Sequence, residues 1–130
     1  MAHDPHDLPE AVLTFLREHH LGTLTTQRAD GSPHVVPVGF AFDADERVVR
    51  IISAGGSQKV ANADRGRTRA AVCQVDGARW LTLEGPVRVL RDRDQVRRAE
   101  VAYEARYQAP RERADRVAIV IDVERVMGRG

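Results

Sequence analysis

Short alternating segments joined by tight turns limit the fold of this chain more than any other feature. Apolar and polar residues alternate with a period of two in several stretches, a pattern typical of β-strands with one buried face. The turns between them, at residues 29–33, 43–46 and 76–77, are too short to hold a crossover helix. Antiparallel neighbours need only such short connections, so the pattern predicts an antiparallel sheet.

Six strands and three helices are expected along the 130 residues, which fit one domain and leave no room for a second. The expected N-caps of the helices are Asp7, Ser57, and either Asp92 or Asp94. Helices are predicted at residues 8–20, 57–64 and 95–107, and strands at 21–26, 34–42, 48–53, 69–75, 80–90 and 116–126. The predicted fold class is therefore α+β: one antiparallel barrel over residues 1–130, flanked by helices.

Composition excludes several classes of protein. The chain is 42% hydrophobic and 30% charged, and no apolar run approaches the roughly 20 residues that cross a bilayer. Its polar, acidic N-terminus is unlike a secretory signal peptide, so a cytoplasmic location is expected. The net charge of +1 is spread along the chain, without the basic stripe that binds nucleic acid. Cys73, the single cysteine, cannot form an intramolecular disulfide and is expected to be a buried small hydrophobe.

The loop at residues 55–59 is the sharpest chemical feature. It reads Gly-Gly-Ser-Gln-Lys between a predicted strand and a predicted helix, where free backbone amides and the helix dipole favour an anion by about 0.3 to 1 kcal/mol per charge. Lys59 is the only lysine among the 20 lysine and arginine residues. An ordinary turn with a surface lysine fits the pattern as well, but the lone lysine favours a phosphate site. The loop matches neither the Walker motif nor a dinucleotide fingerprint.

Two other residues are unusual. Pro37 stands within a predicted strand, although proline cannot donate to a sheet ladder, which predicts a sheet edge or a ligand-binding position. Trp80, the only tryptophan, is either a core aromatic or a platform that stacks on a flat heterocycle from a neighbouring subunit. The histidines lack the spacing of metal ligands, and the serines lack a nucleophile-elbow pattern, so neither a metal site nor hydrolase chemistry is expected.

Three segments carry a family resemblance: residues 30–38 (DGSPHVVPV), 53–59 (SAGGSQK) and 80–85 (WLTLEG). In this order they resemble the split β-barrel flavin and deazaflavin oxidoreductases, relatives of pyridoxamine phosphate oxidase. The likeness covers nearly the whole chain and implies a six-stranded antiparallel split β-barrel. Residues 62–65 (NADR) and 74–80 (QVDGARW) make the chain most similar to the branch of coenzyme F420-dependent biliverdin reductases.

The resemblance implies a homodimer with two cofactor sites at the subunit interface. Its phosphate-binding positions correspond to Ser53, Ser57, Gln58 and Lys59. The strand that lies along the cofactor ring corresponds to His34, Val36, Pro37 and Val38, and Trp80 would approach the ring from the partner subunit. Arg50 and Arg65 are further candidates, for the acidic tail of the deazaflavin.

Two departures separate this chain from the flavin mononucleotide (FMN) oxidases of the family. Gln58 stands where those enzymes commonly have an arginine, which removes one positive charge from the site of the compact terminal phosphate. The sequence also stops at Gly130, without the C-terminal segment that binds pyridoxal substrates. These departures favour F420 over FMN, the alternative cofactor, and argue against oxidation of vitamin B6.

The resemblance therefore implies an F420-dependent reductase. The reduced deazaflavin is a hydride donor, and the hypothesis is that it passes hydride to the central bridging carbon of biliverdin, a tetrapyrrole, and gives bilirubin. Arg79 is one of several arginines that could pair with the propionates of the substrate, and no residue stands out as catalytic or as the proton donor. Two alternatives stay open: reduction of another conjugated or quinone-like acceptor, and a non-catalytic module that binds flavin, deazaflavin or haem.

Overall fold

The computed structural model describes residues 1–130 as one antiparallel sheet with three helices against it. The helices are α1 (Glu10–Arg17), α2 (Gln58–Ala63) and α3 (Arg93–Arg106). The strands are β1 (Ala2–His3), β2 (Gly22–Gln27), β3 (Pro33–Val38), β4 (Ala41–Asp43), β5 (Val48–Ala54), β6 (Arg69–Asp76), β7 (Arg79–Leu90), β8 (Arg116–Asp122) and β9 (Arg125–Arg129). The predicted α+β class and antiparallel pairing are confirmed.

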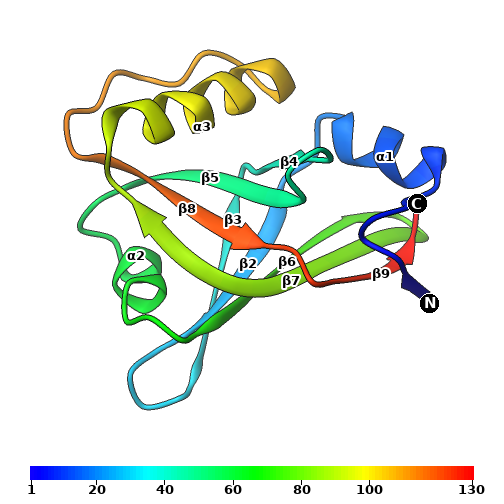
Figure 1. The fold of residues 1–130 in the computed structure, drawn as a ribbon, viewed down its shortest axis with the longest axis horizontal. Helices are drawn as coiled ribbons and strands as arrows, with labels where there is room; N and C mark the ends of the chain where they lie inside the picture. The colour runs from blue at the N-terminus through cyan, green and yellow to red at the C-terminus, as the bar shows by residue number, and fades with distance from the viewer.

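Strand β7 joins the two halves of the sheet. The order is β3-β2-β6-β7-β8-β5-β4, with β9 also paired to β7 and β1 paired to β9. The first part of β7 pairs with β9 up to Glu84, and its last part pairs with β8 from Val87 onward. Because β3 and β4 end the path without pairing with each other, the sheet curls without closing, as in a split barrel (Figure 1). The predicted irregularity at Gly85–Pro86 is the point where β7 changes partners.

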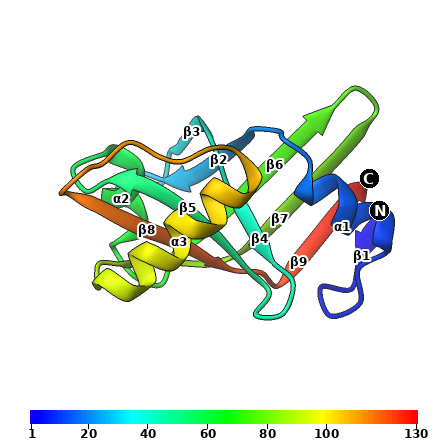
Figure 2. The same ribbon diagram turned by 90° about the horizontal axis from the view of Figure 1, so that it is seen from above.

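The helices cover different parts of this sheet. Helix α3 lies across β5 and β8, while α1 lies beside the two chain termini, which β1 and β9 bring together (Figures 1 and 2). The short α2 packs against β2 and β7. No helix of the structure has both the length and the apolar character needed to cross a bilayer.

The core lies inside the curled sheet. Its largest fully buried side chains include Phe15 from α1, Leu24 from β2, Ile51 from β5 and Leu81 from β7. Burial of each such side chain contributes about 1.5 to 3 kcal/mol. Phe40, between β3 and β4, is equally buried, and the guanidinium of Arg106 from α3 lies 4.6 Å from the centre of its ring.

Two predicted strands are each divided, and this raises the strand count above six. The segment 34–42 breaks at Gly39 and Phe40, because the Phe40 N–H donates to Tyr107 Oη at 3.1 Å and its carbonyl accepts from Arg106 Nη1 at 2.8 Å. Side chains at the C-terminal end of α3 thus take the place of the backbone hydrogen bonds that a neighbouring strand would make with Phe40. The segment 116–126 breaks near Val123, whose N–H donates to the carbonyl of Arg47 at 2.9 Å. The third addition, β1, has only two residues and was not predicted.

The helix caps are partly as predicted. Asp92 caps α3, because its Oδ2 accepts from the N–H of Gln95 at 3.1 Å. Ser57 holds the N-cap position of α2 but makes no side-chain cap hydrogen bond. The prediction for the first helix is wrong at both ends: α1 begins after Pro9 rather than Asp7 and ends at Arg17, since Glu18 is already extended.

Gly85 is where the two halves of the sheet come closest. A methyl group at this position would lie 1.8 Å from the carbonyl oxygen of Asp122 and 3.2 Å from the backbone nitrogen of Glu124. We therefore expect Gly85→Ala to lower the free energy of unfolding by about 2 to 4 kcal/mol, because backbone atoms must shift. Urea denaturation monitored by circular dichroism measures this loss as a lower midpoint.

Gly56 provides the matched control. An added methyl group there meets no heavy atom within 4 Å, and its φ lies outside the left-handed region. Gly56→Ala should be neutral or stabilise the protein by up to about 1 kcal/mol. Equal midpoints for the two variants would contradict the role of Gly85.

Candidate functional site

A groove of about 680 Å³ lies between the end of β3, the end of β5, and the segment that follows α3. Its lining combines apolar residues such as Val38 and Ile52 with charged residues such as Lys59, which suits a ligand with a flat ring and charged extensions. The lining residues are Pro37, Val38, Gly39, Ile52, Ser53, Ala54, Lys59, Tyr103, Gln108, Ala109, Pro110, Arg111, Glu112, Arg113 and Arg116. The structure thus brings together four residues that the sequence singled out: Pro37, Val38, Ser53 and Lys59.

Lys59 is the electrostatic centre of this groove. It follows the first residue of α2, is half-buried, and has no carboxylate within 4.0 Å and no hydrogen-bond partner in the protein. Burial lowers the pKa of its ammonium group below the usual 10.5, because desolvation penalises the charged form. A bound anion would favour the charged form and raise this pKa again. Since α2 has only six residues, the charge of Lys59 contributes more here than the helix dipole.

The loop before Lys59 places two hydroxyl groups next to each other. Ser53, the buried next-to-last residue of β5, and Ser57 share a hydrogen bond of 2.9 Å between their Oγ atoms. Gly55 allows the loop to pack, because its N–H donates to the carbonyl of Asp115 at 2.9 Å and a methyl group there would lie 2.9 Å from that oxygen. A methyl group added at Gly56 would meet no heavy atom within 4 Å, so this part of the loop is open to a ligand.

Gln58 points away from the groove. Its Nε2 donates to Asn62 Oδ1 at 2.7 Å, and Asn62 Nδ2 donates to Thr26 Oγ1 at 3.0 Å. Asn62 and Thr26 are buried, so this chain of side chains ties the start of α2 to β2. The carboxamide of Gln58 is therefore held by the protein and is not among the groove-lining groups.

Strand β3 contributes to the groove only at its C-terminal end. Pro37 and Val38 line it, whereas Val36 packs against the hydrophobic core. His34 lies near the N-terminal end of the strand, and its buried Nδ1 has no hydrogen-bond partner. The prediction that Pro37 marks a sheet edge is confirmed, since β3 pairs only with β2.

Seven predicted site residues are not in the lining of the groove: Ser57, Gln58, Val36 and His34, described above, and Arg50, Arg65 and Trp80. Arg50 is buried and makes ion pairs of 2.8 Å with Asp43 and with Glu46, so its charge is already balanced. Arg65 donates to the carbonyl of Arg28 at 3.1 Å in the turn after α2. Trp80 is the second residue of β7 and is half-buried on the outer face of the sheet, where it pairs with Val75, so it is not a core aromatic.

The segment after α3 supplies groove residues that sequence reasoning missed. Arg116 opens β8 opposite Ala54, with its guanidinium 2.9 Å from Glu100. Tyr103 lines the groove from α3, and its ring lies so close to Gly39 that a methyl group there would be 2.7 Å from its Cε2. The run of arginines at 111–116 was visible in the sequence, but nothing in its pattern placed it near Lys59.

A second polar cluster lies at the tip of the β6–β7 hairpin. Glu18, His20 and Asp76 lie close enough together to hold a metal ion, but Arg79 already bridges the carboxylates of Glu18 and Asp76, at 3.1 and 2.5 Å. Hydrogen bonds from Arg79 and then from His20 lower the pKa of Glu18. Arg79 thus already balances this acidic charge within the protein, and it is not among the residues that line the groove.

Comparisons with known proteins agree with this geometry. Residues 8–129 match the family model of pyridoxamine 5'-phosphate oxidase. The sequence is 54% identical over 121 residues, 93% of this chain and 88% of the relative, to the F420H(2)-dependent biliverdin reductase of Mycobacterium tuberculosis. A solved F420 reductase superposes with a TM-score of 0.73 at 28% identity, covering 92% of this chain and 98% of that chain. A conserved hypothetical protein of M. tuberculosis superposes with a TM-score of 0.77 at 23% identity, covering 94% of this chain and 84% of that chain, which shows the fold alone.

Because Lys59 is the only lysine, its titration can be followed directly. With ¹³C-labelled lysine, NMR should show a single side-chain signal whose midpoint lies below 10.5 and rises when inorganic phosphate is added. Phosphate affinity should correspondingly fall as the pH increases through that midpoint. In denaturant the midpoint should return to about the value of a free lysine. A titration midpoint of the folded protein that lies at or above 10.5 and does not change when phosphate is added would exclude an anion site at Lys59.

Proposed function

We propose that this chain, which belongs to the pyridoxamine 5'-phosphate oxidase family, is an F420-dependent reductase that converts biliverdin to bilirubin. The observation that carries the proposal is the half-buried, partnerless ammonium group of Lys59 in a groove that also has apolar residues in its lining. Such a group favours a cofactor with an anionic phosphate and a flat ring. The 54% identity to an F420H(2)-dependent biliverdin reductase supports both the cofactor and the substrate.

The groove residues fit this cofactor. Lys59, with the hydroxyls of Ser53 and Ser57, would hold the phosphate region, and Arg116 adds a second positive charge close by. Pro37 and Val38 offer an apolar edge to the ring system. When bound, F420 supplies a hydride, which the bridging carbon of the tetrapyrrole accepts. The protein orients the reactants, which lowers a barrier by several kcal/mol.

Gln58 supports a preference for F420 over FMN. A neutral side chain at this position contributes no charge to a compact terminal phosphate, and its amide is already tied to Asn62. Lys59 is thus the only positively charged side chain of the loop.

The hydroxyl group of Tyr103 is free to form a hydrogen bond with a substrate, because its Oη makes no hydrogen bond within the protein. The proton that completes the reduction comes from water or from such a group.

The outer face of the sheet supports a homodimer. By register, Val35, Val75, Trp80 and Met127 project from one face of the β3-β2-β6-β7-β9 half. Val75 is 62% exposed, Val35 56% and Met127 43%, an apolar surface that a second copy would cover. In one protomer Trp80 lies away from the groove, so it reaches a cofactor only across such an interface.

Turnover tests the reductase proposal. Purified protein should oxidise reduced F420 when biliverdin is added, with bilirubin appearing in equal amount, and it should bind F420 more tightly than FMN. Lys59→Ala should weaken F420 binding by about 1 to 3 kcal/mol, since a charged hydrogen bond is lost, and Lys59→Arg should retain part of the affinity. Fluorescence titration measures the dissociation constants.

The alternatives give different outcomes in the same assays. If the protein reduces quinone-like acceptors but not biliverdin, the proposed substrate is wrong and the proposed cofactor is right. Tight binding of F420, flavin or haem without hydride transfer to any acceptor would indicate a binding module. Unchanged F420 affinity in Lys59→Ala would contradict the placement of the phosphate.

The dimer has its own test. Val75→Glu should convert the protein from a dimer to a monomer in sedimentation velocity, because a charge cannot be buried at the apolar interface without a partner. The matched control is Val101→Glu, since Val101 is an exposed valine on α3, away from this face, with 51% exposure. A monomeric wild-type protein, or a Val75→Glu variant that stays dimeric, would overturn this interface.

A further inference from the structure

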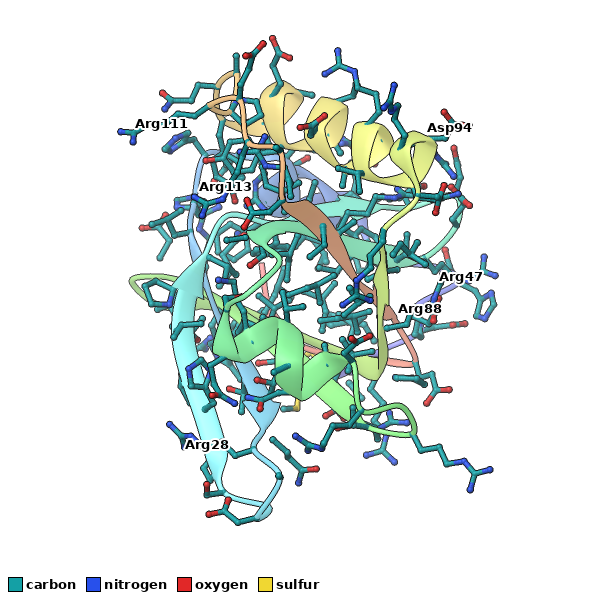
Figure 3. The ribbon with its side chains drawn as sticks, turned by 90° about the vertical axis from the view of Figure 1, so that its left-hand side faces the viewer. Arg28, Arg47, Arg88, Asp94, Arg111 and Arg113 are labelled. Atoms are coloured by element: carbon teal, nitrogen blue, oxygen red, sulfur yellow. The ribbon has the colours of Figure 1, made fainter.

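Two further hollows continue the groove along α3. One, of about 520 Å³, lies between α3 and the segment that follows it, and the next, of about 640 Å³, reaches the first turn of α3. All three depressions share Arg113 and Arg116 in their lining, so they lie next to one another, and we call this row of hollows beside the Lys59 groove the track. Figure 3 shows Arg111 and Arg113 on the segment between α3 and β8, with Asp94 at the opposite end of α3.

Uncompensated arginines line this track. Arg93 and Arg111 have no carboxylate within 4.0 Å, and the only one near Arg97 is Glu100, at 3.7 Å. Glu100 is also the partner of Arg116, at 2.9 Å, so one carboxylate faces two guanidinium groups. We refer to Arg93, Arg97 and Arg111 as the arginine rim. These three side chains are exposed and free to turn toward a ligand.

The spacing of the rim indicates which anions it suits. Arg93 and Arg97 are one helical turn apart, about 6 Å, and Arg111 lies on a different element. A compact phosphate cannot reach all three, whereas separate carboxylates on a flexible chain can, and the guanidinium fork matches a carboxylate well. Glu104 and Glu112 are in the same lining, so the hollow mixes both signs of charge and a ligand anion must approach the arginines rather than these carboxylates.

We propose that the arginine rim is a second anion site, which binds carboxylate groups of a ligand held at Lys59. This inference rests on the proposed function, because the ligand is the coenzyme or its substrate. Carboxylates can come from two sources: the acidic tail of F420, which would extend from its phosphate along the track, and the propionates of the tetrapyrrole. The chemistry at the rim is the same for both.

Binding measurements distinguish the sources. The probes are F420 with a longer and a shorter acidic tail, the deazaflavin without phosphate and tail, biliverdin, and biliverdin dimethyl ester. If the rim binds the coenzyme tail, Arg111→Ala should weaken binding of tailed F420 about three- to tenfold, and adding Arg97→Ala should weaken it further, with no effect on the tailless deazaflavin. High salt should shrink these differences. If the rim binds the substrate, the same variants should weaken biliverdin binding and leave its dimethyl ester unaffected.

Arg17→Ala is the matched control. Arg125 lies by register on the proposed dimer face, so its loss tests charge at that interface, whereas Arg17→Ala removes one exposed positive charge from α1, outside the track and that face, and should leave every dissociation constant unchanged. The rim is overturned if wild type and rim variants bind all coenzyme forms and both substrate forms equally well. Failure of the proposed function looks different, because the wild-type protein would then bind no form of F420, and both proposals would fall.

Discussion

The passage of β7 through both halves of the sheet is the constraint on which the rest of the structure depends. At Gly85 the strand leaves β9 and joins β8, and the backbone of Asp122 lies so close that no side chain fits. This contact sets where β8 begins and ends relative to β5. Because β5 and β8 carry Ser53 and Arg116 at their ends, one backbone crossing far from the groove determines how the groove is assembled.

The α3 end stabilises the other wall of the groove. Arg106 donates to the carbonyls of Glu18 and Phe40 at 2.8 Å and to Gln74 Oε1, and Tyr107 Oη donates to the carbonyl of His20 at 2.6 Å. Burial lowers the pKa of Arg106, but each of these oxygens favours its charged form. These bonds attach α3 to α1 and to the β3–β4 connection. The segment that follows α3 therefore starts from a fixed point as it passes over the groove.

Local patterns predicted what depends on neighbours in sequence. The loop at 55–59 lies between a strand and a helix as expected, and Ser53 and Lys59 line the same groove, since they are only six positions apart in the sequence. Arg50 lies outside that groove, because closeness in sequence takes no account of competing partners. Three residues of strand move it about 10 Å from Ser53, toward the turn that supplies Asp43 and Glu46. Tyr103 and Arg116 reach the groove only through tertiary packing, which no periodicity reveals.

The distribution of positive charge gives these contacts a functional meaning. Most arginines of this chain are matched by a carboxylate or a backbone carbonyl, as Arg79 and Arg129 are. An exposed arginine without a partner loses little, because water solvates it. A half-buried ammonium group has lost part of its water and gained no oxygen from the protein, so the folded chain bears that cost until an anion arrives. Lys59 therefore differs from the other basic residues in its surroundings as well as in its chemistry, and this difference is the basis for proposing an anionic ligand there.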